Sequence, residues 1–145
     1  MTTSRRDALD AVVALVRADA ELRRRLDSQL SGVHGLSLND LVILTGLHEA
    51  PAGRLRRIDL AARLGVTASA VTRLLVPLEK VGLVHRESDP RDARSAMATL
   101  TPAGTERARD AEVTATAIAQ QLLGDRLSTA EVATLSRLLR KLAPF

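Results

Sequence analysis

A segment in the middle of the chain, RIDLAARLGVTASAVTRLLVPLEK from Arg57 to Lys80, constrains the fold more than any other feature. Ala61, Gly65 and Val71 have the spacing Ala-x3-Gly-x5-Val, which is typical of two helices joined by a tight turn. A small residue is favoured where the helix backbones approach, and the turn glycine can adopt a positive φ where a side chain would clash. The segment is therefore predicted to form a helix-turn-helix.

The second helix of this pair is predicted to have two faces of different chemistry. Its buried face consists of apolar residues at helical spacing: Val71, Leu74, Leu75, Leu78 and Val81. Its exposed face consists of short side chains and one arginine: Ala68, Ser69, Thr72, Arg73 and Val76. Short side chains permit a close approach to base edges, and Arg73 can donate two hydrogen bonds to guanine. Thr67 as N-cap, Ser69 and the helix N-terminus are expected to hold phosphates in the major groove.

Two short strands are predicted after this helix, at Leu83–Glu87 and Ser95–Leu100, joined by the turn-rich tip SDPRDAR. A basic hairpin in this position is a wing. We expect Arg91 and Arg94 to reach the neighbouring minor groove, where arginine senses groove width and A·T content. Asp92 is expected to orient Arg94 through a salt bridge. The alternative is an ion pair on an exposed loop, worth less than ~1 kcal/mol.

The positive charge of the chain is concentrated in this region. The net charge is +4, and residues 54–94 contain nine basic and five acidic residues, while the other twelve basic and twelve acidic residues cancel. A polyanion partner is predicted, with a merely solvated basic surface as the alternative. The only aromatic residue is Phe145, so no platform exists for stacking single-stranded bases, and duplex DNA is favoured. The residues assigned to DNA contact are Arg56, Arg57, Thr67, Ser69, Ala70, Thr72, Arg73, Arg86, Arg91 and Arg94.

Two features depart from a simple helix-turn-helix. Pro77 lacks the amide that would bond to the Arg73 carbonyl, so a kink is expected in the C-terminal half of the second helix. Arg56 and Arg57 stand where a short hydroxyl or acidic cap is ordinary. Phosphate contact and a poorly capped helix both explain these two arginines.

Helices are predicted on both sides of this segment, over about residues 5–30, 38–48 and 102–123, followed by a last helix whose capping box is Ser128 and Glu131. The central segment is too small to cover the apolar stripes of the terminal helices. A second copy of the chain is the simplest cover, and a closed monomeric bundle is the alternative. The predicted fold is one domain over residues 1–145, mainly α with a small β-hairpin wing (α+β). Residues 36–100 form a winged helix-turn-helix lobe, and residues 4–35 and 101–145 form a helical dimerisation region.

Composition excludes several other kinds of site. The absence of cysteine excludes disulfides and thiolate chemistry, and His34, His48 and His85 lack metal-binding spacing, so no metal, cofactor or catalytic site is expected. No apolar run approaches the ~18 residues of a membrane span. The first ten residues have no apolar core of the signal-peptide type. We therefore expect a cytoplasmic protein with no membrane partner.

Residues 36–101 as a whole resemble the MarR family of bacterial winged-helix transcription factors. The matching pieces are LAARLGVTASAVTRLL, LEKVGLVHR, DPRDAR and LTPAG, in this order. The resemblance implies a homodimer held by its terminal helices, with one winged lobe per protomer on pseudo-palindromic duplex DNA. It also implies that Arg94, in an Asp-x-Arg wing motif, enters the minor groove.

Many members of this family are repressors released by small anionic ligands. The expected function is therefore that of a dimeric, sequence-specific double-stranded DNA-binding transcriptional regulator, a repressor whose DNA affinity a small-molecule effector modulates. No set of residues identifies the effector site. The alternative is a winged-helix dimer that acts as a protein-interaction or structural module without operator binding.

Overall fold

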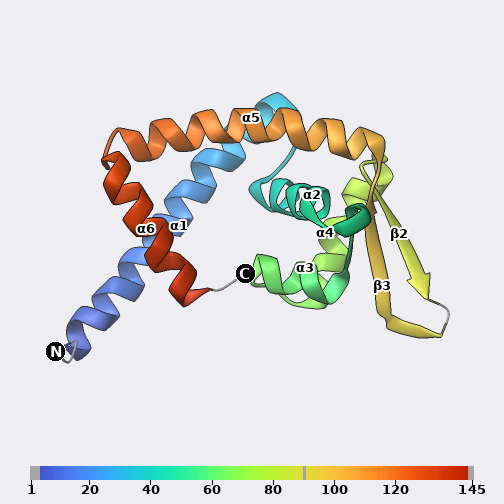
Figure 1. The fold of residues 1–145 in the computed structure, drawn as a ribbon, viewed down its shortest axis with the longest axis horizontal. Helices are drawn as coiled ribbons and strands as arrows, with labels where there is room; N and C mark the ends of the chain where they lie inside the picture. The colour runs from blue at the N-terminus through green and yellow to red at the C-terminus, as the bar shows by residue number, and fades with distance from the viewer. Residues whose placement is uncertain (1–3, 90, 144–145) are drawn as a thin grey trace.

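The computed structural model describes residues 4–89 and 91–143, except for the side chains of residues 88, 89 and 93–95. Six helices dominate it: α1 (Arg5–His34), α2 (Leu38–Glu49), α3 (Arg57–Leu64), α4 (Ala68–Lys80), α5 (Pro102–Gly124) and α6 (Thr129–Leu142). The strands are β1 (Arg54–Arg56), β2 (Val84–Asp89) and β3 (Asp92–Leu100), and a 3-10 turn, Pro51–Gly53, precedes β1. In Figure 1, α5 runs as a long bar above the molecule, with α1 and α6 on one side and α2, α3, α4 and the sheet on the other. The predicted fold class, mainly α with a small wing, is confirmed.

The lobe below α5 is built around completely buried aliphatic side chains. The largest of them come from α1, α2, α3 and α4: Leu30, Ile43, Leu44, Leu47, Leu60, Val71 and Leu75. Full burial of such a side chain stabilises the fold by about 1.5–3 kcal/mol. The helix-turn-helix therefore rests on a core completed within one chain.

The sheet has three antiparallel strands in the order β1-β3-β2. Only a two-stranded hairpin was expected, so the prediction missed β1, which pairs Leu55 with Ala98. Three residues are too few for an alternating pattern to show in the sequence. The hairpin is also longer than predicted, because β2 ends at Asp89 and β3 already begins at Asp92, with an irregular register between Glu87 and Asp89.

The start of α5 is fastened to the base of the wing (residues 84–100). Thr101 caps α5, as predicted: its Oγ1 accepts from the Gly104 amide (3.0 Å) and donates to the Gly82 carbonyl (2.6 Å). A Cβ on Gly104 would lie 2.0 Å from the Leu83 carbonyl oxygen. Glycine is therefore required here by the close approach of two backbones.

The first helix is one turn longer than predicted. It continues past Leu30 to His34 and ends at Gly35, which has a φ of +65°. The last turn is held by α5: His34 Nε2 lies 2.7 Å from Thr114 Oγ1, and Arg107 donates to the His34 carbonyl at 2.9 Å. These contacts are distant in sequence, so local pattern could not reveal them.

The apolar stripes of the terminal helices remain exposed in the single chain, as predicted. We call these residues the terminal stripes: Leu9, Val12, Val13 and Val16 on α1, and Leu138, Leu139 and Leu142 on α6. No α6 residue is buried among those described. Within the described residues no single helix has both the length and the apolarity to cross a membrane, although two bent helix pairs meet that test together.

Candidate nucleic-acid interface

Helices α3 and α4 form the predicted helix-turn-helix, bent by 101° relative to each other. Gly65 in the turn has a φ of +67°, and the Val66 amide donates to the Ala61 carbonyl at 3.1 Å. Beyond its two chain neighbours, a Cβ built on Gly65 would meet nothing within 4 Å. The positive φ itself, which strains any residue that has a side chain, therefore accounts for the glycine.

The recognition helix, α4, has the predicted N-cap and most of the predicted buried face. Thr67 Oγ1 accepts from the Ala70 amide at 3.1 Å, and Val71, Leu75 and Leu78 are buried. Val81 was expected on this face but is 67% exposed. It follows the last helical residue, Lys80, and therefore does not continue the helical spacing. The helix runs through Pro77 without ending.

On the outer face of α4, some side chains are exposed to solvent, and others are half-buried or hydrogen-bonded within the protein. Ser69 and Arg73 are exposed, whereas Ala70, Thr72 and Val76 are half-buried. Thr72 Oγ1 accepts from Arg57 Nη1 (2.6 Å) and donates to the Ala68 carbonyl (3.2 Å). Thr72 is thus occupied within the protein. Arg73 makes no hydrogen bond or ion pair with any residue that the structure describes, so its guanidinium is available to a ligand.

The two arginines at the start of α3 have different surroundings. Arg56 is the N-cap of α3 but makes no side-chain capping bond. Its Nε donates to Asp59 Oδ2 at 3.0 Å, and this hydrogen bond raises the pKa of the Arg56 guanidinium. Arg57 is half-buried and reaches Thr72, so it joins α3 to α4.

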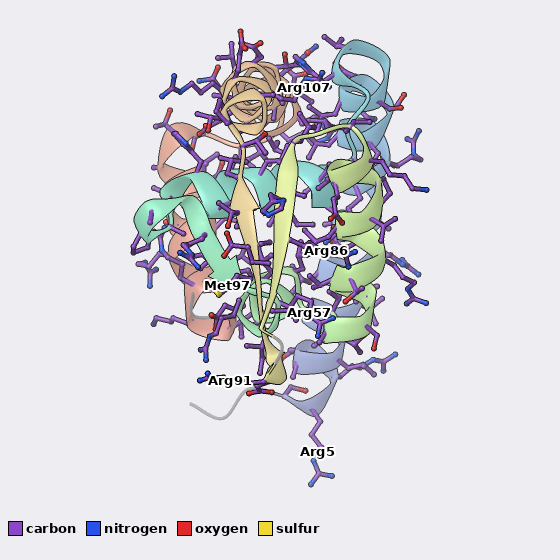
Figure 2. All side chains as sticks on the ribbon, turned by 90° about the vertical axis from the view of Figure 1, so that its right-hand side faces the viewer. Arg5, Arg57, Arg86, Arg91, Met97 and Arg107 are labelled. Atoms are coloured by element: carbon purple, nitrogen blue, oxygen red, sulfur yellow. The ribbon has the colours of Figure 1, made fainter. Side chains whose placement is uncertain are left out.

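Arginines also lie at both ends of the wing. Arg91 and Asp92 are exposed at its tip, and Figure 2 shows Arg91 at the end far from α5. Arg86 points from β2 towards α4 (Figure 2), and its Nε donates to Glu79 Oε2 at 2.6 Å. The side chain of Arg94 lies outside the described residues, as does the predicted Asp92–Arg94 salt bridge.

Several basic residues of the lobe are already paired with acidic residues of the same chain, so they contribute less free positive charge than the sequence suggests. Arg54, Arg56 and Arg86 are paired with Glu87, Asp59 and Glu79, respectively. Glu79 was not predicted as the partner of Arg86, because the two residues are seven positions apart across a turn and no local spacing rule connects them. The pairing of Arg54 with Glu87 was not predicted either, because it depends on the undetected strand β1. Arg63, Arg73 and Lys80 are exposed and in no ion pair between described residues.

Nothing among the described residues resembles a metal site. No group of three or more histidine or acidic side chains is placed to hold an ion. His34 is bonded to Thr114, and His48 and His85 are exposed on α2 and β2. The three histidines therefore lie on three different elements, α1, α2 and β2.

Comparison with known proteins agrees with this geometry. Residues 36–96 match the MarR family. An HTH-type transcriptional repressor from Mycobacterium tuberculosis is 34% identical over 128 residues, which cover 88% of this chain and 89% of that protein. A MarR family transcriptional regulator from Streptomyces coelicolor, solved in complex with DNA, has a TM-score of 0.82 and 29% identity, covering 99% of this chain and 89% of that one.

A mutant MarR from E. coli, solved with operator DNA, has a TM-score of 0.76 and 26% identity over 98% of this chain and the whole of that chain. The similarity thus extends beyond the helix-turn-helix to the terminal helices. The chain belongs to the MarR family, whose members regulate transcription and are not enzymes.

Proposed function

We propose that this chain is a dimeric, sequence-specific double-stranded DNA-binding transcriptional regulator that acts as a repressor in the cytoplasm. The observation that carries the proposal is the outer face of α4, where exposed Ser69 and Arg73 stand above a buried aliphatic face. A rigidly packed helix with one free guanidinium suits a major groove. The relatives solved with DNA and the relative named as a repressor support the same reading.

The dimer in this proposal is formed by residues 4–35 and 101–145. The terminal stripes expose large aliphatic side chains, including Leu9, Val16 and Leu142 at 62%, 62% and 73%. Contiguous exposed apolar surface of this kind marks interfaces. A second copy supplies a matching surface by two-fold symmetry, which places two lobes, residues 36–100 of each chain, on a pseudo-palindromic duplex.

The contacts to DNA are divided by groove. Arg73 reads guanine in the major groove, while Thr67, Ser69 and the N-terminus of α4 hold phosphates. Arg91 and Arg94 of the wing enter the neighbouring minor groove. Arg56 lies near the phosphates. The DNA-binding surface of α4 is supported from the protein side by the half-buried residues Ala70, Thr72 and Arg57. No cofactor takes part, and a small-molecule effector modulates the affinity, as the family resemblance implies.

Selection of bound fragments from a random duplex pool tests this proposal most broadly. We expect one enriched motif with two half-sites about one helical turn apart. Fluorescence anisotropy on that duplex then measures Arg73→Ala, which should relax the preference for one base pair by about 1–3 kcal/mol. Arg109→Ala, at an exposed arginine of α5, is the matched control and should leave the preference unchanged.

The same measurement separates the competing function. Equal affinity for the selected and a scrambled duplex contradicts operator binding and leaves a winged-helix dimer that serves protein interaction. A retained base preference in Arg73→Ala contradicts only the role of this residue.

A further inference from the structure

The position of Arg86 in the sheet directs its side chain towards the recognition helix. On β2, Val84 is 2% exposed, His85 is exposed and Arg86 is half-buried, as expected where successive side chains alternate between two faces. Arg86 pairs across the sheet with Ala98, which is completely buried. Arg86 therefore lies on the inner face of the wing, next to α4, and not on its outer surface.

Its partner, Glu79, belongs to the last turn of α4. The Nε–Oε2 distance is 2.6 Å, and the two side chains are 36% and 35% exposed. About two-thirds of each side chain is thus withdrawn from water, which strengthens a charge-assisted hydrogen bond relative to an exposed pair. A second ion pair on the described part of the sheet, Arg54–Glu87, is more exposed, at 45% and 49%.

The last turn of α4 has a particular need for such an anchor. Pro77 has no amide to donate to the Arg73 carbonyl, so one helix hydrogen bond is missing where α4 approaches its end. The turn that follows is short, with the Leu83 amide bonded to the Leu78 carbonyl at 2.9 Å. The Glu79–Arg86 pair spans this turn and joins α4 to β2 by their side chains as well.

We propose that Arg86 is a positioning residue and not a DNA contact: its ion pair with Glu79 fixes the angle between the recognition helix and the wing. With this angle fixed, the recognition helix and the wing can enter adjacent grooves of the duplex at the same time. This inference rests on the proposed function. It replaces the DNA contact assigned to Arg86 from the sequence.

The salt dependence of DNA binding distinguishes the two roles. A residue that contacts a phosphate contributes about 0.9 to the slope of log affinity against log salt concentration, and its loss lowers the slope by that amount. A positioning residue changes affinity and leaves the slope unchanged. We therefore expect Arg86→Gln to weaken operator binding about tenfold, in the range of coupling between contacting residues, with the slope of the wild type.

Glu79→Gln gives a prediction of opposite sign for the two roles. If Arg86 contacts DNA, removal of Glu79 frees it and removes a negative charge near the phosphates, so binding tightens. If the pair positions the helix, binding weakens to about the level of Arg86→Gln. The exchanged pair, Glu79→Arg with Arg86→Glu, should restore affinity to within about threefold of the wild type, and Arg54→Gln is the control at an exposed pair.

The experiment uses anisotropy titrations of the full chain on the selected duplex and on a random-sequence duplex, from about 50 to 200 mM salt. Thermal melts followed by circular dichroism establish that each variant is folded. A tighter Glu79→Gln variant, or a slope reduced by about one in Arg86→Gln, overturns the inference while the proposed function stands. A wild type that does not distinguish the two duplexes overturns both.

Discussion

The winged lobe and the terminal helices bury their apolar residues in different ways. In the lobe, Leu44, Leu60 and Leu75 are completely buried by other residues of the same chain. In α1, every residue from 5 to 21 is exposed, and α6 has no buried residue. The core of the lobe is therefore completed within one chain, with Leu30 of α1 as part of it, whereas the apolar residues at the start of α1 and on α6 stay uncovered, as the proposed dimer interface requires. Stability should depend on protein concentration in the second region and not in the first.

The largest expected effect is on the lobe core. Leu44→Ala removes a completely buried side chain and should lower the free energy of unfolding by about 2–5 kcal/mol, through lost burial and the cavity left behind. Urea denaturation at two protein concentrations measures this loss, which should be the same at both. Leu142→Ala, at a 73% exposed position, is the counterpart whose cost should appear only where the dimer forms. If the free-energy cost of Leu142→Ala did not depend on protein concentration, the proposed difference between the lobe and the terminal helices would be contradicted.

A smaller effect is expected at the junction between the two regions. Gly104→Ala places a Cβ 2.0 Å from the Leu83 carbonyl oxygen, so the start of α5 must shift away from the base of the wing. Overpacking of this kind costs about 1–3 kcal/mol, measurable by thermal unfolding. Gly32→Ala is the control, since a Cβ there meets no atom within 4 Å. Equal stability of the two variants would show that the junction between α5 and the wing accommodates the added methyl group without cost.

Two helix caps compare the regions directly. Thr67 caps α4 in the lobe, and Ser128 caps α6 in a capping box with Glu131. Substitution of either by alanine should cost about 1 kcal/mol, because one amide at the helix start loses its acceptor. Thr67→Ala should also weaken DNA binding, whereas Ser128→Ala should instead raise the dimer dissociation constant. Sedimentation measures dimer dissociation, and anisotropy measures DNA binding, for both variants. If Thr67→Ala weakened the dimer and Ser128→Ala weakened DNA binding instead, the assignment of α4 to DNA binding and of α6 to the dimer would be contradicted.

The smallest effect concerns a surface carboxylate of α1. Hydrogen bonds from Arg25 and Arg24 lower the pKa of Glu21 below its ordinary value of 4.5. Because the pKa of Glu21 is lower in the folded than in the unfolded state, these hydrogen bonds stabilise the fold at pH values above the unfolded-state pKa. This stabilisation is lost as the pH falls through the folded-state pKa. Arg25→Ala should raise the pKa of Glu21, as followed by NMR titration. An unchanged pKa would show that Arg25 does not hold this carboxylate in solution.

The sequence was most informative where local rules apply. The helix-turn-helix, the Thr67 and Thr101 caps and the capping box at Ser128 were predicted because each depends on residues a few positions apart. Strand β1, the last turn of α1 and the Glu79–Arg86 pair were missed because each depends on partners brought together only by the fold. In the interface, exposure of Arg73 followed from helical spacing, but the engagement of Thr72 by Arg57 did not.

The central claim is that two chains join through their terminal helices and bind one duplex together. Sedimentation equilibrium of the wild type, free and with the selected duplex, tests it most directly. We predict a particle of twice the 15.5 kDa chain mass, two chains on each duplex, and single, DNA-binding-deficient chains for Val12→Asp with Val16→Asp. A wild type that sediments as a single chain at working concentration, or binds the duplex as one chain with undiminished affinity, would contradict the account.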